Sequence, residues 1–146
     1  MYEVKLSLLA RLIALFRKRY RGTRGKGQEW EDVAGRHLRK AGYEILERNF
    51  RARAGEIDFV ARDGETLCFI EVKGRRSTMF GSPTEAVTLE KQRRITRAAQ
   101  AYLQRRRLSG AVCRFDVVSI RDGAANRGVE ILRDAFAGPL PPRPRR

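Results

Sequence analysis

The sequence predicts a single α/β domain with elements in the order α-β-β-β-α-β, forming a mixed sheet flanked by helices. The chain has 146 residues and a hydrophobic fraction of 42%, which suffices for one domain with a core. Apolar residues recur at helical spacing before residue 42 and again after residue 88. Between these segments, three apolar runs have the length and composition of strands.

The first helix ends at Gly42, a residue that often follows a helix C-terminus. His37 lies on the apolar stripe of this helix, so we expect a packed histidine rather than a metal ligand. The stripe consists of Trp30, Val33, Ala34, His37, Leu38 and Ala41.

Three strands are expected over residues 43–50, 56–62 and 66–73. Asp63 and Gly64 separate the second from the third and are a favoured pair for a two-residue hairpin turn. A capped short turn is expected at residues 82–85.

Thr88 can cap a second helix that runs to about Arg107. Residues 114–120 form a further strand, and residues 129–132 a short edge strand. The residues expected to face inward from the second helix are Ile95, Ala98, Ala99, Tyr102 and Leu103.

The two ends of the chain differ from its centre. Residues 1–26 read as a basic amphipathic helix and linker, residues 27–136 as the domain, and residues 137–146 as a disordered tail rich in Pro and Arg. The apolar part of the first segment is too short and too charged to span a bilayer. Residues 1–20 could contact an anionic membrane or nucleic acid, pack on the domain, or be a start-site extension, and the sequence does not rank these alternatives.

The net charge of +15 indicates a polyanionic partner, with nucleic acid as the leading candidate. Two thirds of this charge lies in the two ends, and a compositional preference for Arg is the alternative explanation. Cys68 and Cys113 lack the spacing of a zinc site or disulfide framework, which favours the cytoplasm. A single histidine argues against His-rich metal sites and Ser-His-Asp hydrolases, leaving acids and a metal as the expected chemistry.

The predicted hairpin brings two acids together. If Asp63 and Gly64 are the turn residues, Asp58 pairs with Phe69 and becomes the diagonal neighbour of Glu71 on the same face. Two carboxylates among apolar neighbours repel each other and lose hydration unless a cation joins them. This arrangement predicts a site for Mg²⁺ or Mn²⁺.

Two further residues belong to this hypothesis. Lys73, two residues beyond Glu71, would hold its ammonium near the attacking water or the phosphate oxygens. Glu31 lies beside the stripe of the first helix and could lean over the sheet toward the same ion.

Asp58 with Glu71-Val72-Lys73 resembles the PD-(D/E)XK nuclease signature. The chain also resembles the bacterial YraN family of proposed endonucleases, which are similar to archaeal Holliday-junction resolvases. The resemblance covers about residues 27–136 and rests on Gly27-x-x-x-Glu31-x-x-Ala34, Gly42-Tyr43, Arg48-Asn49-x-Arg51, Gly55-Glu56-Ile57-Asp58, Phe69-Ile70-Glu71-Val72-Lys73-x-Arg75, Lys91-Gln92 and Arg114-Phe115-Asp116-Val117-Val118.

The resemblance implies a restriction-endonuclease-like core. It also implies Glu31, Asp58 and Glu71 as metal ligands, a further ligand in the main-chain carbonyl of Val72, and Lys73 as the catalytic lysine. Two-fold symmetric DNA junctions would favour a homodimer, by analogy.

Additional nucleic-acid contacts are expected from Arg75 and Arg76 after the third strand, and from Lys91 and Gln92 early in the second helix. The sequence thus predicts a metal-dependent endonuclease acting on DNA, with RNA still open. Branched or structured DNA is favoured because no base-reading module is evident. The rivals are a non-catalytic nucleic-acid-binding protein with this fold and a membrane-peripheral adaptor.

Overall fold

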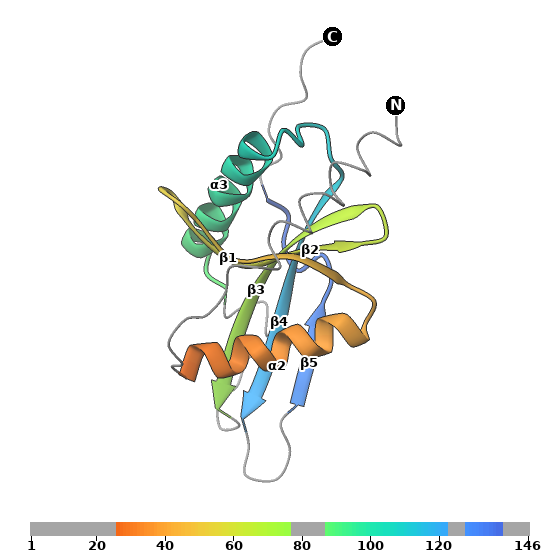
Figure 1. Cartoon of the computed structure of the whole chain (residues 1–146). Helices are drawn as coiled ribbons and strands as arrows, with labels where there is room; N and C mark the ends of the chain where they lie inside the picture. Colours follow the sequence, from red (N-terminus) through yellow and green to blue (C-terminus); the bar gives the residue numbers. More distant parts are fainter. Residues whose placement is uncertain (1–25, 77–86, 123–127, 139–146) are drawn as a thin grey trace.

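The computed structural model describes residues 26–76, 87–122 and 128–138, without the side chains of Lys26, Arg75, Arg76 and Asp122. Over these ranges the chain follows the predicted order, which is thereby confirmed (Figure 1). The elements are α2 (Lys26–Lys40), β1 (Glu44–Ala52), β2 (Gly55–Asp63), β3 (Thr66–Arg76), α3 (Leu89–Arg105), β4 (Cys113–Asp122) and β5 (Gly128–Leu132).

The strands form one mixed sheet in the order β1-β2-β3-β4-β5. Neighbouring strands are antiparallel except β3 and β4, which run parallel. A parallel pair requires a long connection, and α3 lies within it. The mixed sheet flanked by helices agrees with the α/β class expected of a restriction-endonuclease-like core.

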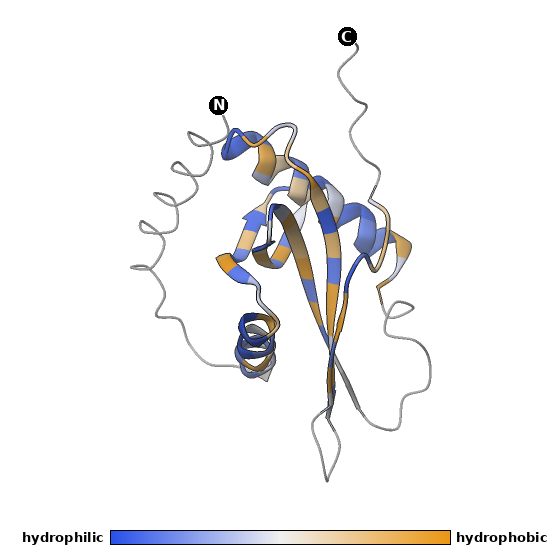
Figure 2. Cartoon of the chain, turned by 90° about the vertical axis from the view of Figure 1, so that its right-hand side faces the viewer, coloured by the Kyte–Doolittle hydropathy of each residue, from blue (hydrophilic) through white to orange (hydrophobic). Residues whose placement is uncertain are grey.

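The two helices cover opposite faces of the sheet. α2 packs on a cluster that includes Phe59, Ile70 and Val118, and α3 packs on a cluster that includes Phe69 and Val117. Figure 2 shows α2 nearly end-on beside the sheet. Because side chains alternate along a strand, β3 directs Phe69 toward α3 and Ile70 toward α2. The side chain of the residue after Ile70 therefore belongs to the α3 face.

The expected inward face of α3 is confirmed, and so is its cap. Thr88 has extended backbone angles, and its side chain accepts a hydrogen bond from the Lys91 N–H at 3.2 Å. Ile95, Ala98, Ala99 and Tyr102 are buried, and Leu103 packs against the same core.

The prediction for His37 was wrong, because its side chain is exposed. Val33, Ala34 and Leu38 on the same helix are buried, as predicted. Gly35 is buried as well, and an added Cβ there would lie 3.5 Å from the Phe59 ring.

The predicted hairpin register was also wrong, by two residues. Asp63 pairs with Thr66 inside the ladder, so the turn residues are Gly64 and Glu65. Gly64 has φ +61°, the sign that a type II′ turn requires at its first central position. The ladder ends at the pair of Phe59 and Ile70, so Asp58 and Glu71 are the next residue beyond it on each strand. A shift of two residues preserves the face of every side chain.

Several predictions fall outside the described residues. The N-terminal segment up to residue 25, the turn at residues 82–85 and the tail from residue 139 are among them, so the division into 1–26, 27–136 and 137–146 stays a prediction. In the ranges that the structure does describe, no helix has the length and apolar character needed to cross a lipid bilayer.

Candidate active site

Asp58 and Glu71 form a pair of acids just beyond the last ladder pair of β2 and β3, Phe59 with Ile70. Glu71 is only 7% exposed, and the main-chain N–H of Val72 donates to Asp58 Oδ2 at 2.8 Å. Burial raises the pKa of Asp58 to about 7, and the charge of Glu71 and a carboxyl–carboxyl hydrogen bond with it contribute to this rise. The two groups are therefore close enough that ionising both is costly.

Lys91 supplies a positive charge to this pair. Its Nζ lies 3.2 Å from Glu71 Oε1, and its charge opposes the rise in the pKa of Asp58. The Thr88 cap fixes the first turn of α3, from which Lys91 extends. Gln92 does not join the acids, because its Nε2 donates to the Val87 carbonyl at 3.0 Å. The structure thus brings Lys91 to the pair and assigns Gln92 to the start of the helix.

Val72 and Lys73 follow Glu71 on β3. The Val72 side chain packs against the α2 cluster, and its N–H points to Asp58. A strand residue directs its N–H and C=O to the same neighbour, so the Val72 carbonyl also faces the β2 side. Alternation puts the half-buried Lys73 on the Glu71 side of the sheet. β3 includes Arg75 and Arg76, whose side chains lie outside the described part.

Glu31 reaches toward Asp58 from α2 but has partners of its own. Asn49 Nδ2 donates to Glu31 Oε2 at 2.9 Å, and Arg48 Nη2 lies 3.7 Å from the same oxygen and 2.8 Å from Asp32 Oδ1. Burial raises the pKa of Glu31, and the charge of Asp58 adds to this shift. Glu31 is therefore within electrostatic range of Asp58, while Asn49 and Arg48 hold its carboxylate.

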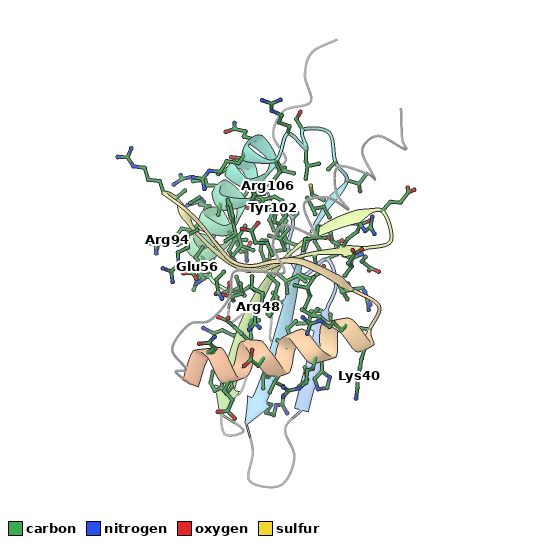
Figure 3. The ribbon with its side chains drawn as sticks, in the orientation of Figure 1. Lys40, Arg48, Glu56, Arg94, Tyr102 and Arg106 are labelled. Carbon is green, nitrogen blue, oxygen red and sulfur yellow. The ribbon has the colours of Figure 1, made fainter. Side chains whose placement is uncertain are left out.

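Sequence reasoning gave Arg48 and Asn49 no role in the site. Asn49 has φ +52°, a left-handed conformation that Asn tolerates better than most residues. Figure 3 shows Arg48 near α2 and the sheet, and its guanidinium lies 5.2 Å from the centre of the Phe59 ring. An Asn in a strand was the signal available, but nothing in the sequence connects it to Glu31.

The donor set at Asp58 and Glu71 fits a hard divalent cation. Mg²⁺ is commonly held by one or two carboxylates and keeps several waters. Within residues 26–76, 87–122 and 128–138, no three His, Cys, Asp or Glu side chains are grouped closely enough to hold a metal. Glu31 thus stands apart from the two acids in this arrangement, and a metal here would rely on Asp58, Glu71 and main-chain oxygen.

The Trp30 ring packs against the backbone of β3 at Gly74, directly after Lys73. A Cβ built on Gly74 would lie 1.6 Å from the Trp30 ring, so only glycine fits at this position. The contact connects α2, which carries Glu31, to the strand that carries Glu71 and Lys73.

We expect Gly74→Ala to destabilise the protein by about 1–3 kcal/mol, because the ring or the strand must move. Denaturant unfolding measures this loss. Gly27→Ala on α2 is the matched control, since nothing lies within 4 Å of an added Cβ there. Equal midpoints for wild type and Gly74→Ala would show that the contact is not as tight as described.

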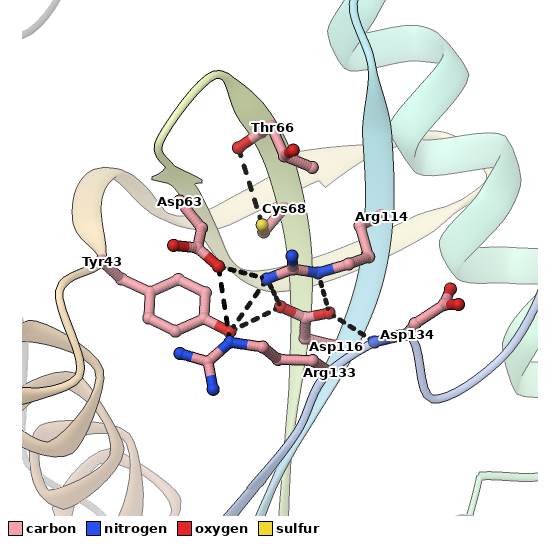
Figure 4. Close-up of polar contacts among 8 residues, drawn as sticks. All are labelled: Tyr43, Asp63, Thr66, Cys68, Arg114, Asp116, Arg133 and Asp134. Atoms are coloured by element: carbon pink, nitrogen blue, oxygen red, sulfur yellow. Dashed lines mark hydrogen bonds and ion pairs between the residues drawn. The ribbon is translucent and has the colours of Figure 1, made fainter.

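A second polar cluster involves Asp116 on β4 (Figure 4). Asp116 is fully buried and accepts hydrogen bonds from Tyr43 Oη at 2.8 Å, Arg114 Nε at 2.8 Å and the Asp134 N–H at 2.9 Å. Arg114 Nη2 also lies 2.7 Å from Asp63 Oδ2. The cluster therefore ties β4 to the end of β2, to the start of β1 and to the chain after β5.

The surroundings of this cluster change the pKa of its members. Burial and the bond to Asp116 raise the pKa of Tyr43, whereas Arg114 lowers that of Asp63. Asp116 lies on the α2 face, since it alternates with Val117, and is thus across the sheet from Glu71. We interpret this cluster as structural.

The family follows from comparison with known proteins. A family model described as "Uncharacterised protein family UPF0102" matches residues 30–120, well over half of the chain. The chain belongs to the UPF0102 family. UPF0102 is the YraN family, so the predicted resemblance is confirmed.

This UPF0102 protein matches relatives from three bacteria over most of the length of each relative. Each is named "UPF0102 protein". The protein from Caldicellulosiruptor saccharolyticus is 44% identical over 112 residues, 75% of this chain and 95% of the relative. Those from Syntrophus aciditrophicus and Chlorobium chlorochromatii are 46% and 48% identical over 75% of this chain, and 87% and 89% of their own lengths. The names of these UPF0102 relatives state no activity.

Proposed function

We propose that this UPF0102 protein is an endonuclease that hydrolyses phosphodiester bonds in DNA with bound Mg²⁺ or Mn²⁺. The single observation that carries the proposal is the Asp58–Glu71 pair, buried beside Lys91, in which the pKa of Asp58 rises to about 7. Two adjacent, largely buried acids lower the stability of a folded protein, because their charges repel and lose hydration. A pair of this kind in one site is therefore a candidate functional site. A bound cation would remove this cost.

Asp58, Glu71 and the Val72 carbonyl would hold the metal, and Glu31 would complete the set only through a shift away from Asn49. The metal would supply Lewis acidity, which makes bound water more acidic and stabilises charge on the phosphate. Lys73 is assigned to the phosphate oxygens or the attacking water, as its place two residues beyond Glu71 suggests. Lys91 holds the Glu71 carboxylate in place.

The preferred substrate is branched or structured DNA, because the described residues contain no helix-turn-helix or zinc site that could read a base sequence. Both cysteines are free, which fits a reducing compartment, and we place the protein in the cytoplasm. A homodimer would match a two-fold symmetric junction.

A non-catalytic nucleic-acid-binding protein is the second candidate. The observation that favours it is that Glu31 is bound by Asn49 and that no three-ligand metal group exists among the described side chains. In that case Asp58 and Glu71 would catalyse no reaction, and the basic residues alone would account for function by binding nucleic acid.

The test is incubation with four-way junctions, flaps, single strands, duplex DNA and RNA in Mg²⁺, Mn²⁺ or chelator. We expect metal-dependent cleavage of branched DNA, and a loss of roughly 10²–10³-fold in Lys73→Ala with junction binding retained. Lys40→Ala removes an exposed lysine on α2 and should cut normally. Wild-type protein that binds junctions but cleaves none of these substrates would establish the second candidate.

A further inference from the structure

Six exposed arginines gather on α3 and on the neighbouring β1–β2 hairpin. We call them the arginine surface: Arg51, Arg53, Arg93, Arg94, Arg97 and Arg105. The hairpin lies directly against the helix, because Arg105 Nη1 donates to the Arg51 carbonyl at 3.1 Å and a Cβ on Gly55 would lie 3.0 Å from the Arg94 carbonyl. The six arginines therefore lie on two elements that contact each other at both ends of α3.

Acids balance only part of this charge. Glu90 pairs with Arg94 at 2.7 Å and Glu56 with Arg51 at 3.5 Å, and all four side chains are exposed. Figure 3 shows Arg94 and Glu56 in the same region, beside α3. Among the described residues, no further acid forms an ion pair with the arginine surface. Exposed pairs of this kind are weak and exchange readily for other anions.

The charges of Arg93 and Arg97 do not stabilise the helix itself. α3 carries five basic residues and one acid, and Arg93 and Arg97 stand four residues apart, where like charges repel. Arg93 and Arg94 are also in the N-terminal half, toward the positive end of the helix dipole. Arg105, like Arg39 and Lys40 on α2, lies in the last turn of its helix, where the dipole favours a positive charge.

The arginine surface begins beside the candidate active site. Lys91, which contacts Glu71, is in the first turn of α3, and Arg94 and Arg97 follow within about 9 Å along the helix axis. An anion held by these arginines would therefore lie next to the acids. Guanidinium groups are well suited to this because they bind phosphate oxygens in pairs.

We infer that the arginine surface binds the sugar–phosphate backbone of the nucleic acid whose other part occupies the Asp58–Glu71 site. It holds the substrate in position without reading its sequence. The identity of the substrate rests on the proposed function, whereas backbone binding by these arginines does not require cleavage.

The experiment measures binding of a fluorescent four-way DNA junction by the full-length protein in chelator, over a series of salt concentrations. Arg53→Gln/Arg93→Gln/Arg97→Gln removes three exposed charges that form no ion pair with any acid in the described part of the chain. The matched control, Arg36→Gln/Arg39→Gln/Lys40→Gln, removes three exposed charges from α2, on the other side of the sheet. Thermal unfolding checks that both variants fold.

We expect the surface variant to bind more than about 10-fold more weakly at moderate salt, and the slope of log K against log salt to fall by about three, since each lost phosphate contact contributes close to one. The control should change the slope by less than about one. Equal losses in both variants would reduce the effect to net charge and overturn the inference, as would normal binding by the surface variant. The assay measures binding and requires no cleavage. Its outcome therefore tests the arginine surface even if the protein proves not to be a nuclease.

Discussion

Asp116→Ala is expected to lower the free energy of unfolding by about 3–5 kcal/mol, because a buried ion pair loses one partner. The change leaves Arg114, the Tyr43 hydroxyl and the Asp134 N–H without the acceptor that joins them. A loss of this size should lower Tm by more than about 10 °C. Urea unfolding and calorimetry measure both quantities.

Graded variants keep this prediction informative. Tyr43→Phe removes one donor from Asp116 and should cost about 1–2 kcal/mol. Glu130→Ala, at an exposed acid on the neighbouring strand β5, is the control and should stay within about 0.5 kcal/mol of wild type. If Asp116→Ala unfolds at the same urea concentration as Glu130→Ala, the cluster does not hold the strands together.

Asp58→Asn is expected to stabilise the metal-free protein at pH 8 while abolishing cleavage. The folded pKa of Asp58, about 7, is above its unfolded value of about 3.9, so folding favours the protonated acid. Stability from this group is therefore complete below about pH 4 and is lost as the pH rises to about 7. In the variant this loss disappears, and the gain at pH 8 should be on the order of 2–4 kcal/mol.

The measurement is urea unfolding at pH 4.5 and pH 8 in chelator, then with added Mg²⁺ or Mn²⁺. Wild type should gain stability from the metal at pH 8, and Asp58→Asn should not. Cleavage should fall by more than about 10³-fold in the variant. Glu56→Gln, at an exposed acid on the same strand, should behave as wild type does. A wild type whose stability rises between pH 4.5 and pH 8 in chelator, with no gain in Asp58→Asn, would contradict the account of the pair.

Local patterns in the sequence were sufficient for the elements. The Thr88 cap, the inward face of α3 and the order of helices and strands along the chain all depend on residues close in the sequence, and each prediction was confirmed. The predicted hairpin register was wrong because Gly64 can be either the second or the first central residue of a two-residue turn. In the structure Gly64 is the first central residue, in a type II′ turn. The predicted proximity of Asp58 and Glu71 was still correct, because a register error of two residues does not change the face on which a side chain lies.

The remaining features depend on contacts between distant residues. Tyr43 and Asp116 are 73 positions apart, and Asn49 meets Glu31 only because β1 passes beside α2. Nothing in the local pattern indicates either bond. The burial of Gly35 likewise depends on Phe59, which comes from β2.

The ladder between β2 and β3 also determines where the chain can be lengthened. Extra residues placed between Gly64 and Glu65 would enlarge the hairpin tip and leave the pairing of Phe59 with Ile70 intact. A single residue inserted between Phe59 and Asp63 would instead turn Asp58 to the far side of the ribbon from Glu71. A reporter peptide or an attachment point for a dye therefore belongs at the tip, and a one-residue insertion in the strand is a compact way to separate the two acids without replacing either.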